Sequence, residues 1–185
     1  MTQNEFRLCF WKQYLLLEKD FLATDEYVTI SKSNNATFSS RYTNLFLNIC
    51  SEIDSLCDTY CRIMQLKPKT KNIIGKMEII LNKDSNLKNR ETKTKYPYEI
   101  ICRKPFQKIC IGETTSESNS TDWWQAYNLV KHFREDFSEK MPNYRRANLM
   151  NVLDSLAGLY ILCQSLYGQL EDNQIQLERS NLFVE

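Results

Sequence analysis

Apolar residues recur at intervals of three and four along three long stretches of the chain, a pattern typical of amphipathic helices. These stretches span residues 6–22, 45–63 and 149–167. The second stops before Lys67-Pro68, because proline disfavours helical backbone in the residue that precedes it. The third ends near Gly168, a residue type common at helix ends. The pattern therefore predicts three long helices.

Two shorter helices are predicted between the second and third long ones, over residues 72–90 and 122–138. The second of these follows the polar stretch 112–121, which ends in Ser120 and Thr121. With Asp122 these residues provide good N-cap chemistry. Pro142-Asn143 marks a break before the last long helix.

Short β-like runs occupy residues 98–102 and 109–111, and they allow either a small hairpin or extended chain. The 185 residues include only four Gly and four Pro, which disfavours a loop-rich all-β fold. We therefore expect an all-α protein with a single domain over residues 1–185, a bundle of four to five helices. Residues 67–111 would be a small basic insertion or arm, extended or folded as a hairpin.

The net charge of +1 conceals a segregation of charge along the chain. Residues 62–108 hold 13 Lys and Arg against 4 Asp and Glu. Residues 1–61 hold 5 against 8, and residues 109–185 hold 6 against 11. A basic segment thus lies between two acidic ones.

The basic segment has two interpretations. In the first it lies along the phosphates of RNA, with Tyr96, Tyr98 and Phe106 available to stack on bases. The residues expected to hold the RNA are Lys67, Lys69, Lys71, Lys93, Lys95, Arg103 and Lys104. In the second it is a solvated face that complements acidic parts of the same molecule or of a second subunit.

Seven cysteines sit mostly inside apolar runs, and their odd number argues against a secreted disulfide framework, so buried thiols are expected. Their spacing and the single histidine disfavour zinc, and we expect no metal or other cofactor. The N-terminus lacks the features of a signal peptide, and the longest apolar run, 156–163, is shorter than a membrane span. We expect a cytoplasmic protein without a membrane partner.

The only histidine lies in the segment WWQAYNLVKHFR, residues 123–134. On a helix, His132 shares a face with Asn128 and has Lys131 and Arg134 beside it. Imidazole transfers protons near neutral pH, an amide orients a phosphate oxygen or the ring, and cations stabilise charge developing on phosphorus. The cluster is a candidate for metal-independent chemistry on a phosphodiester.

A structural role is the alternative for this histidine. A lone histidine near Trp123, Trp124 and Tyr127 is often a hydrogen-bonded packing residue. Asp136, one turn further on, would pair with it as a salt bridge on the helix surface.

The same segment, followed by RANLMNVLDSLAGLY at residues 146–160, resembles the C-terminal half of HEPN-superfamily proteins, over roughly residues 120–168. The resemblance implies a bundle of four to five helices, commonly dimeric, from toxin–antitoxin, abortive-infection or CRISPR-linked defence. The family signature is an Arg, a polar residue that is often Asn, and a His, which cleave RNA without metal at a dimer interface. Asn128 and His132 match the last two, whereas Tyr127 stands in place of the Arg.

The resemblance implies a homodimeric endoribonuclease or RNA-binding effector, with an antitoxin or another defence-system protein as a further partner. His132 would be the general acid or base, Asn128 would orient the scissile phosphate or the ring, and Lys131 and Arg134 would stabilise charge. Because Tyr127 replaces the Arg, the alternative is a non-catalytic helical module for dimerisation or partner binding. A structural subunit of a larger assembly is the third interpretation.

Overall fold

The computed structural model describes residues 1–109, 122–170 and 175–184. Its α-helices are α1 (Gln3–Phe6), α2 (Lys12–Leu22), α3 (Ser40–Ile63), α4 (Ile73–Lys83), α5 (Asp122–His132) and α6 (Leu149–Gly168). A π-helical turn, Arg7–Trp11, joins α1 to α2. Short 3-10 helices occupy Ala23–Glu26, Lys32–Asn34, Ser85–Asn89 and Asn143–Arg146. The strands are β1 (Thr92–Thr94), β2 (Cys102–Arg103), β3 (Phe137–Ser138), β4 (Met141–Pro142) and β5 (Phe183–Val184).

The predominantly helical character predicted from the sequence is confirmed, and the three long helices lie where the apolar pattern placed them. The helical run from α1 through α2 covers the predicted 6–22. Helix α3 begins earlier than the pattern, because Ser39 Oγ accepts a hydrogen bond from the Tyr42 amide at 3.1 Å and caps it there. Asn148 caps α6 in the same way.

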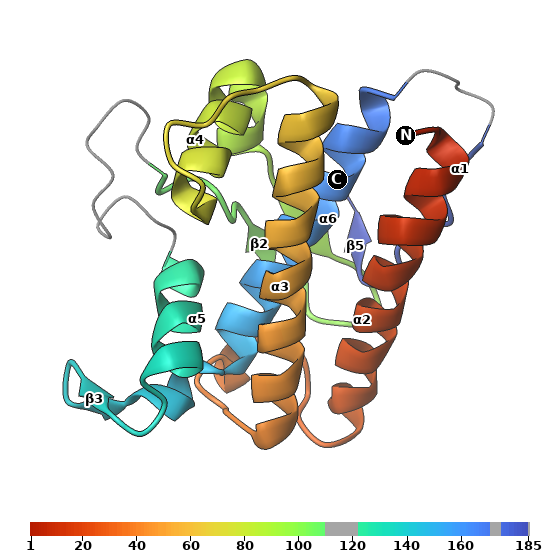
Figure 1. The fold of residues 1–185 in the computed structure, drawn as a ribbon. Helices are drawn as coiled ribbons and strands as arrows, with labels where there is room; N and C mark the ends of the chain where they lie inside the picture. The colour runs from red at the N-terminus through yellow and green to blue at the C-terminus, as the bar shows by residue number, and fades with distance from the viewer. Residues whose placement is uncertain (110–121, 171–174, 185) are drawn as a thin grey trace.

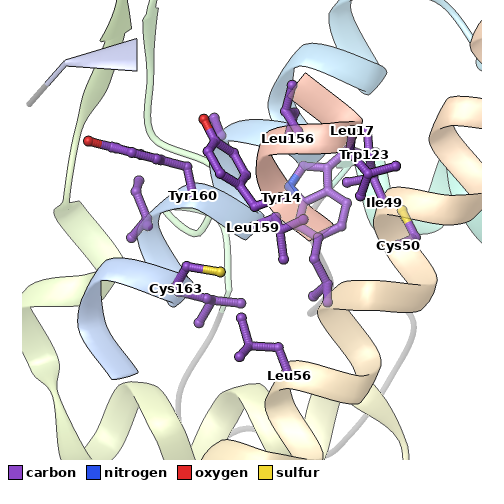
Figure 2. Packing of buried hydrophobic residues seen from close by; sticks show 14 of the residues in the cluster. Tyr14, Leu17, Ile49, Cys50, Leu56, Trp123, Leu156, Leu159, Tyr160 and Cys163 are labelled. Atoms are coloured by element: carbon purple, nitrogen blue, oxygen red, sulfur yellow. The ribbon is translucent and has the colours of Figure 1, made fainter. Parts of the chain in front are cut away.

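Helices α3 and α6 run side by side through the centre of the molecule, with α2 on one flank and α5 on the other (Figure 1). Figure 2 shows side chains of α2, α3 and α6 packed together with Trp123 of α5. By length and composition α6 would suffice to cross a membrane, but 83% of its most apolar window is buried inside the molecule. Burial within the domain therefore accounts for the apolar character of α6.

The small sheet differs from the predicted hairpin. Strand β1 lies in the centre, antiparallel to β2 on one side and to β5 on the other. Of the run 98–102 only Cys102 belongs to a strand, and Ile109 lies outside strands. Residues 110–111 lie outside the described residues. The missed strands are two or three residues long, too short for a period-two pattern to stand out.

Helix α5 ends at His132, six residues before the predicted end at 138. Asn143, which is fully buried, donates from Nδ2 to the carbonyl oxygen of Phe133 at 2.8 Å, and its amide donates to the carbonyl oxygen of Asp136 at 2.9 Å. These bonds turn the chain away from the helix axis and into the β3–β4 hairpin. The chain is non-helical at Pro142-Asn143 as predicted, but α5 already ends ten residues earlier, where Asn143 binds the backbone that follows His132.

The described part of the basic segment packs into the core. Phe106, expected to be free for base stacking, is fully buried, and so is Leu87. Lys76 is also buried, with Nζ 2.8 Å from a carboxylate oxygen of Asp54 and 2.8 Å from one of Asp58, which fixes α4 against α3. The ion pairs of Lys76 thus join the basic segment 62–108 to the acidic segment 1–61 within one molecule.

The cysteines follow the prediction in part. Cys50, Cys57, Cys61 and Cys163 are buried free thiols. Cys9 and Cys102 are exposed, contrary to the expectation, and Cys102 lies on β2, an edge strand of the small sheet.

Candidate functional site

The predicted cluster around His132 lies at the C-terminal end of α5, beside the β3–β4 hairpin (Figure 1). His132, Lys131 and Arg134 are exposed, and Asn128 is half-buried. Among the described residues His132 forms no hydrogen bond or ion pair, and the predicted pair with Asp136 is not formed because the helix has already ended. The imidazole is therefore accessible to a ligand.

The two cations of this cluster are held by local contacts. Lys131 Nζ lies 5.4 Å from the centre of the Tyr127 ring, a cation–π distance. Arg134 Nε donates to the carbonyl oxygen of Val130 at 3.2 Å. Both residues are exposed, so their charged groups are accessible to an anion.

Tyr127, the residue in the place of the family's Arg, is a core residue with 6% of its surface exposed. Its ring centre lies 4.8 Å from that of Trp124 and 6.1 Å from that of Phe46. The phenol is therefore largely shielded from solvent, whereas the imidazole of His132 is exposed. Tyr127 contacts the cluster through the Lys131 ammonium over its ring.

Two exposed aromatic side chains follow His132 in the sequence. Phe133 follows it directly and is 52% exposed, and Phe137 on β3 is 71% exposed. Neither is buried by packing in the described residues, and large exposed rings mark interaction surfaces. We call His132, Asn128, Lys131, Arg134, Phe133 and Phe137 the His132 surface.

The residues predicted to hold RNA do not form one surface. Lys67, Lys69 and Lys71 are exposed in the connection between α3 and α4, at the end of the molecule opposite the His132 surface (Figure 1). Lys93 is exposed on β1, and Lys95 Nζ donates to the carbonyl oxygen of Ser180 at 2.7 Å. Arg103 and Lys104 lie in a separate cleft.

This cleft lies between β2, the turn that follows it, and the N-terminal end of α5, and its volume is about 320 Å³. We call it the Arg103 cleft. The lining residues are Glu91, Cys102, Arg103, Lys104, Pro105, Gln107, Lys108, Asp122, Trp123 and Asp154.

A close approach at Gly158 positions the cleft. A Cβ at Gly158 would lie 3.3 Å from the Phe106 ring and 3.5 Å from Trp123, so the absence of a side chain lets both rings reach α6. Trp123 Nε1 also donates to the carbonyl oxygen of Pro105 at 3.0 Å. These contacts anchor the chain directly after Lys104 and bring Arg103 to Asp154, one turn before Gly158.

Arg103 and Asp154 form an enclosed ion pair at the base of the cleft. Arg103 Nε lies 3.1 Å from Asp154 Oδ1, and 16% and 21% of the two side chains are exposed. Burial raises the pKa of Asp154 to about 6, although Arg103 acts to lower it. A carboxyl group with a raised pKa beside a fixed cation in a cleft is a candidate functional group.

The sequence analysis missed Asp154, and a signal for it was present. Asp154 is the only charged residue between Leu149 and Gly168 in an otherwise apolar helix. Charged residues are rarely buried unless paired, so a single carboxylate in a buried stripe indicates a partner from elsewhere in the chain. The pattern does not show that Arg103 is this partner, because the two residues are 51 positions apart.

Comparisons of the chain with protein-family models, curated proteins and solved structures find no significant match. The HEPN resemblance therefore rests on the motif residues, two of which, Asn128 and His132, lie on an accessible surface.

Proposed function

We propose that the protein is a HEPN-like RNA-binding effector of a bacterial defence or toxin system, and that it cleaves RNA without a metal ion at the His132 surface. The accessibility of His132, which lies beside Lys131 and Arg134, is the observation that supports this proposal most directly. In the proposed dimer the two copies of α5 face each other and both imidazoles reach one RNA strand.

In the proposed reaction His132 takes the proton of a ribose 2′-hydroxyl, and the 2′-oxygen attacks the adjacent phosphorus. The bond from phosphorus to the 5′-oxygen breaks, and this oxygen takes up a proton. The products are a cyclic phosphate end and a 5′-hydroxyl end. Asn128 orients the phosphate, while Lys131 and Arg134 stabilise its added charge in place of the absent Arg.

The exposed rings give the surface a way to hold single-stranded RNA. Base–aromatic stacking tolerates any sequence and contributes about 1–3 kcal/mol per base. Phe133 and Phe137 supply two exposed rings beside the cations. Binding of this kind weakens steeply as salt increases, because the cations release counterions from the phosphates.

The test is cleavage of end-labelled single-stranded and hairpin RNA by the full-length protein in the presence of a chelator. We expect cleavage by the wild type, and a loss of roughly 10²–10⁴-fold in the rate for His132→Ala, the contribution of a positioned acid–base group. Glu135→Ala, at an exposed neighbouring position, is the matched control and should cleave like the wild type. Cleavage that His132→Ala retains would overturn the catalytic assignment.

The burial of Tyr127 favours a second function, a non-catalytic module for dimerisation or partner binding. In this function one face of α5 packs in the core and the other contacts a second copy or a partner protein. Phe133 and Phe137 lie in that interface. A dimer in sedimentation that neither binds nor cleaves RNA, and that Phe137→Ser converts to a monomer, would establish this function over the first.

A further inference from the structure

The Arg103 cleft is a second potential site, separate from the His132 surface. The two lie at opposite ends of α5, and ten residues of helical rise separate Asp122 from His132 by about 15 Å. The cleft volume of about 320 Å³ is in the range of small-molecule pockets. A ligand bound in it is therefore independent of the proposed cleavage chemistry.

The unsatisfied groups at the base of the cleft are hydrogen-bond donors. Arg103 Nε and Nη2 are buried and have no hydrogen-bond acceptor among the described residues. Asp154 Oδ1 lies close enough for an ion pair without aligning as an acceptor. A guanidinium carries five N–H groups in a planar fork that fits the oxygens of a carboxylate or phosphate. The missing partner is therefore an anionic acceptor.

The lysines at the rim form ion pairs that are exposed to solvent. Lys104 Nζ lies 3.5 Å from a Glu91 carboxylate oxygen, with 41% and 46% of the two side chains exposed. Lys108 pairs with Asp122, with 69% and 66% exposed. Exposed pairs of this kind contribute about 0–1 kcal/mol, so a more highly charged anion competes for these lysines.

The carboxylates of the cleft do not favour a cation instead. Among the described residues no group of three or more His, Cys, Asp or Glu is arranged to hold a metal ion. Glu91, Asp122 and Asp154 are each paired with a cation, and Asp122 also lies close enough to Asp154 to raise the pKa of that carboxyl. The chemistry of the cleft thus points to an anion with several acceptor oxygens, such as the phosphate of a phosphomonoester.

We propose that the Arg103 cleft binds the phosphate group of a small phosphomonoester of the size of a 5′-mononucleotide. Lys104 and Lys108 turn from their carboxylates to the phosphate oxygens at the rim. The Arg103–Asp154 pair forms the floor and supplies guanidinium N–H donors to the phosphate.

The test is isothermal titration of the full-length protein with AMP, inorganic phosphate, and adenosine as the uncharged analogue. We expect AMP and phosphate to bind, and adenosine to bind at least about tenfold more weakly than AMP. Lys104→Gln/Lys108→Gln should weaken AMP binding about tenfold or more, because charge-assisted hydrogen bonds are lost. Lys83→Gln, an exposed lysine of α4 outside the cleft, should bind AMP like the wild type.

Three outcomes overturn the proposal. The first is equal affinity for AMP and adenosine, and the second is an unchanged affinity of the double lysine variant for AMP. The third is that phosphate does not bind, whereas MgCl₂ alone binds to both the wild type and the double variant. RNA decamers with a 5′-phosphate or a 5′-hydroxyl identify the source of the phosphate. Binding of only the phosphorylated decamer, without AMP binding, would overturn the small molecule as ligand and assign the cleft to an RNA end. AMP binding without RNA cleavage would leave the cleft assigned and remove only the proposed cleavage.

Discussion

The two ends of α5 hold their charges in opposite ways. At the N-terminal end, Arg103 and Asp154 are enclosed, and the packing of neighbouring rings on Gly158 fixes their position. At the C-terminal end, His132 and Lys131 are exposed, and Lys131 is held by a cation–π contact with Tyr127. Enclosure costs desolvation and gives a fixed geometry, whereas exposure costs little and gives access.

This difference matches each end to a different kind of ligand. A fixed ion pair at the base of a cleft suits one small anionic group, because the donors do not have to reorganise when it binds. An open surface with cations and exposed rings suits a polymer that continues past the site, because no wall blocks the chain. The comparison makes separable predictions, since the two ends share no side chain.

The largest expected effect concerns the boundary between the His132 surface and the core. Tyr127→Arg introduces the Arg of the HEPN signature, but it replaces a buried ring that packs on Trp124 and Phe46. We expect a loss of about 3 kcal/mol or more in the free energy of unfolding, from lost packing and a poorly solvated charge, measured by urea denaturation. Lys131→Ala, one turn further on and exposed, should change it by less than about 1 kcal/mol. A Tyr127→Arg variant as stable as the wild type would show that this position is open to the surface.

The next effect concerns the enclosed pair. Asp154→Ala leaves the Arg103 guanidinium without its carboxylate, and breaking a buried pair in this way costs roughly 3 kcal/mol. Asp122→Ala removes a carboxylate from an exposed pair in the same cleft, and it should cost less than about 1 kcal/mol. If both variants lose the same free energy of unfolding in urea denaturation, the distinction between the enclosed Asp154 and the exposed Asp122 is wrong.

The same contrast explains what the sequence was able to predict. The long helices depend on a periodic pattern within each segment, and His132 and Asn128 are four residues apart on one of them, so their proximity follows from helix geometry. Local information was sufficient for both.

The other features depend on contacts between distant segments. Arg103 meets Asp154 because Phe106 and Trp123 pack on α6, and no pattern within a single segment encodes this meeting. Helix α5 ends early because Asn143, eleven residues after His132, binds the carbonyl of Phe133. Phe106 lies in a basic segment that suggested a solvated arm, yet it is buried. Tertiary packing overrides the local pattern in each case.

A smaller effect is expected in the pH dependence of stability. The pKa of Asp154 is about 6 in the folded chain and about 3.9 when unfolded. Between these values the folded chain holds the proton more tightly, so the stabilising contribution of protonation is complete below about pH 4 and is lost as the pH rises through about 6. The unfolding free energy of the wild type minus that of Asp154→Asn should therefore fall by about 1 kcal/mol per pH unit between pH 4 and 6. A constant difference across this range would show that Asp154 titrates normally.

The smallest expected effect is on the stability of His132→Ala. His132 is exposed, and within the described residues it has no hydrogen bond or ion pair to lose. Surface substitutions of this kind change the free energy of unfolding by about 0.5 kcal/mol or less, so the melting temperature should stay close to that of the wild type. This small value is informative because the same variant is expected to lose most RNA cleavage, and a loss of activity without a loss of stability separates a chemical role from a packing role. If the substitution instead costs more than about 1 kcal/mol, His132 contributes to packing, and the contrast between an open and an enclosed end of α5 does not hold.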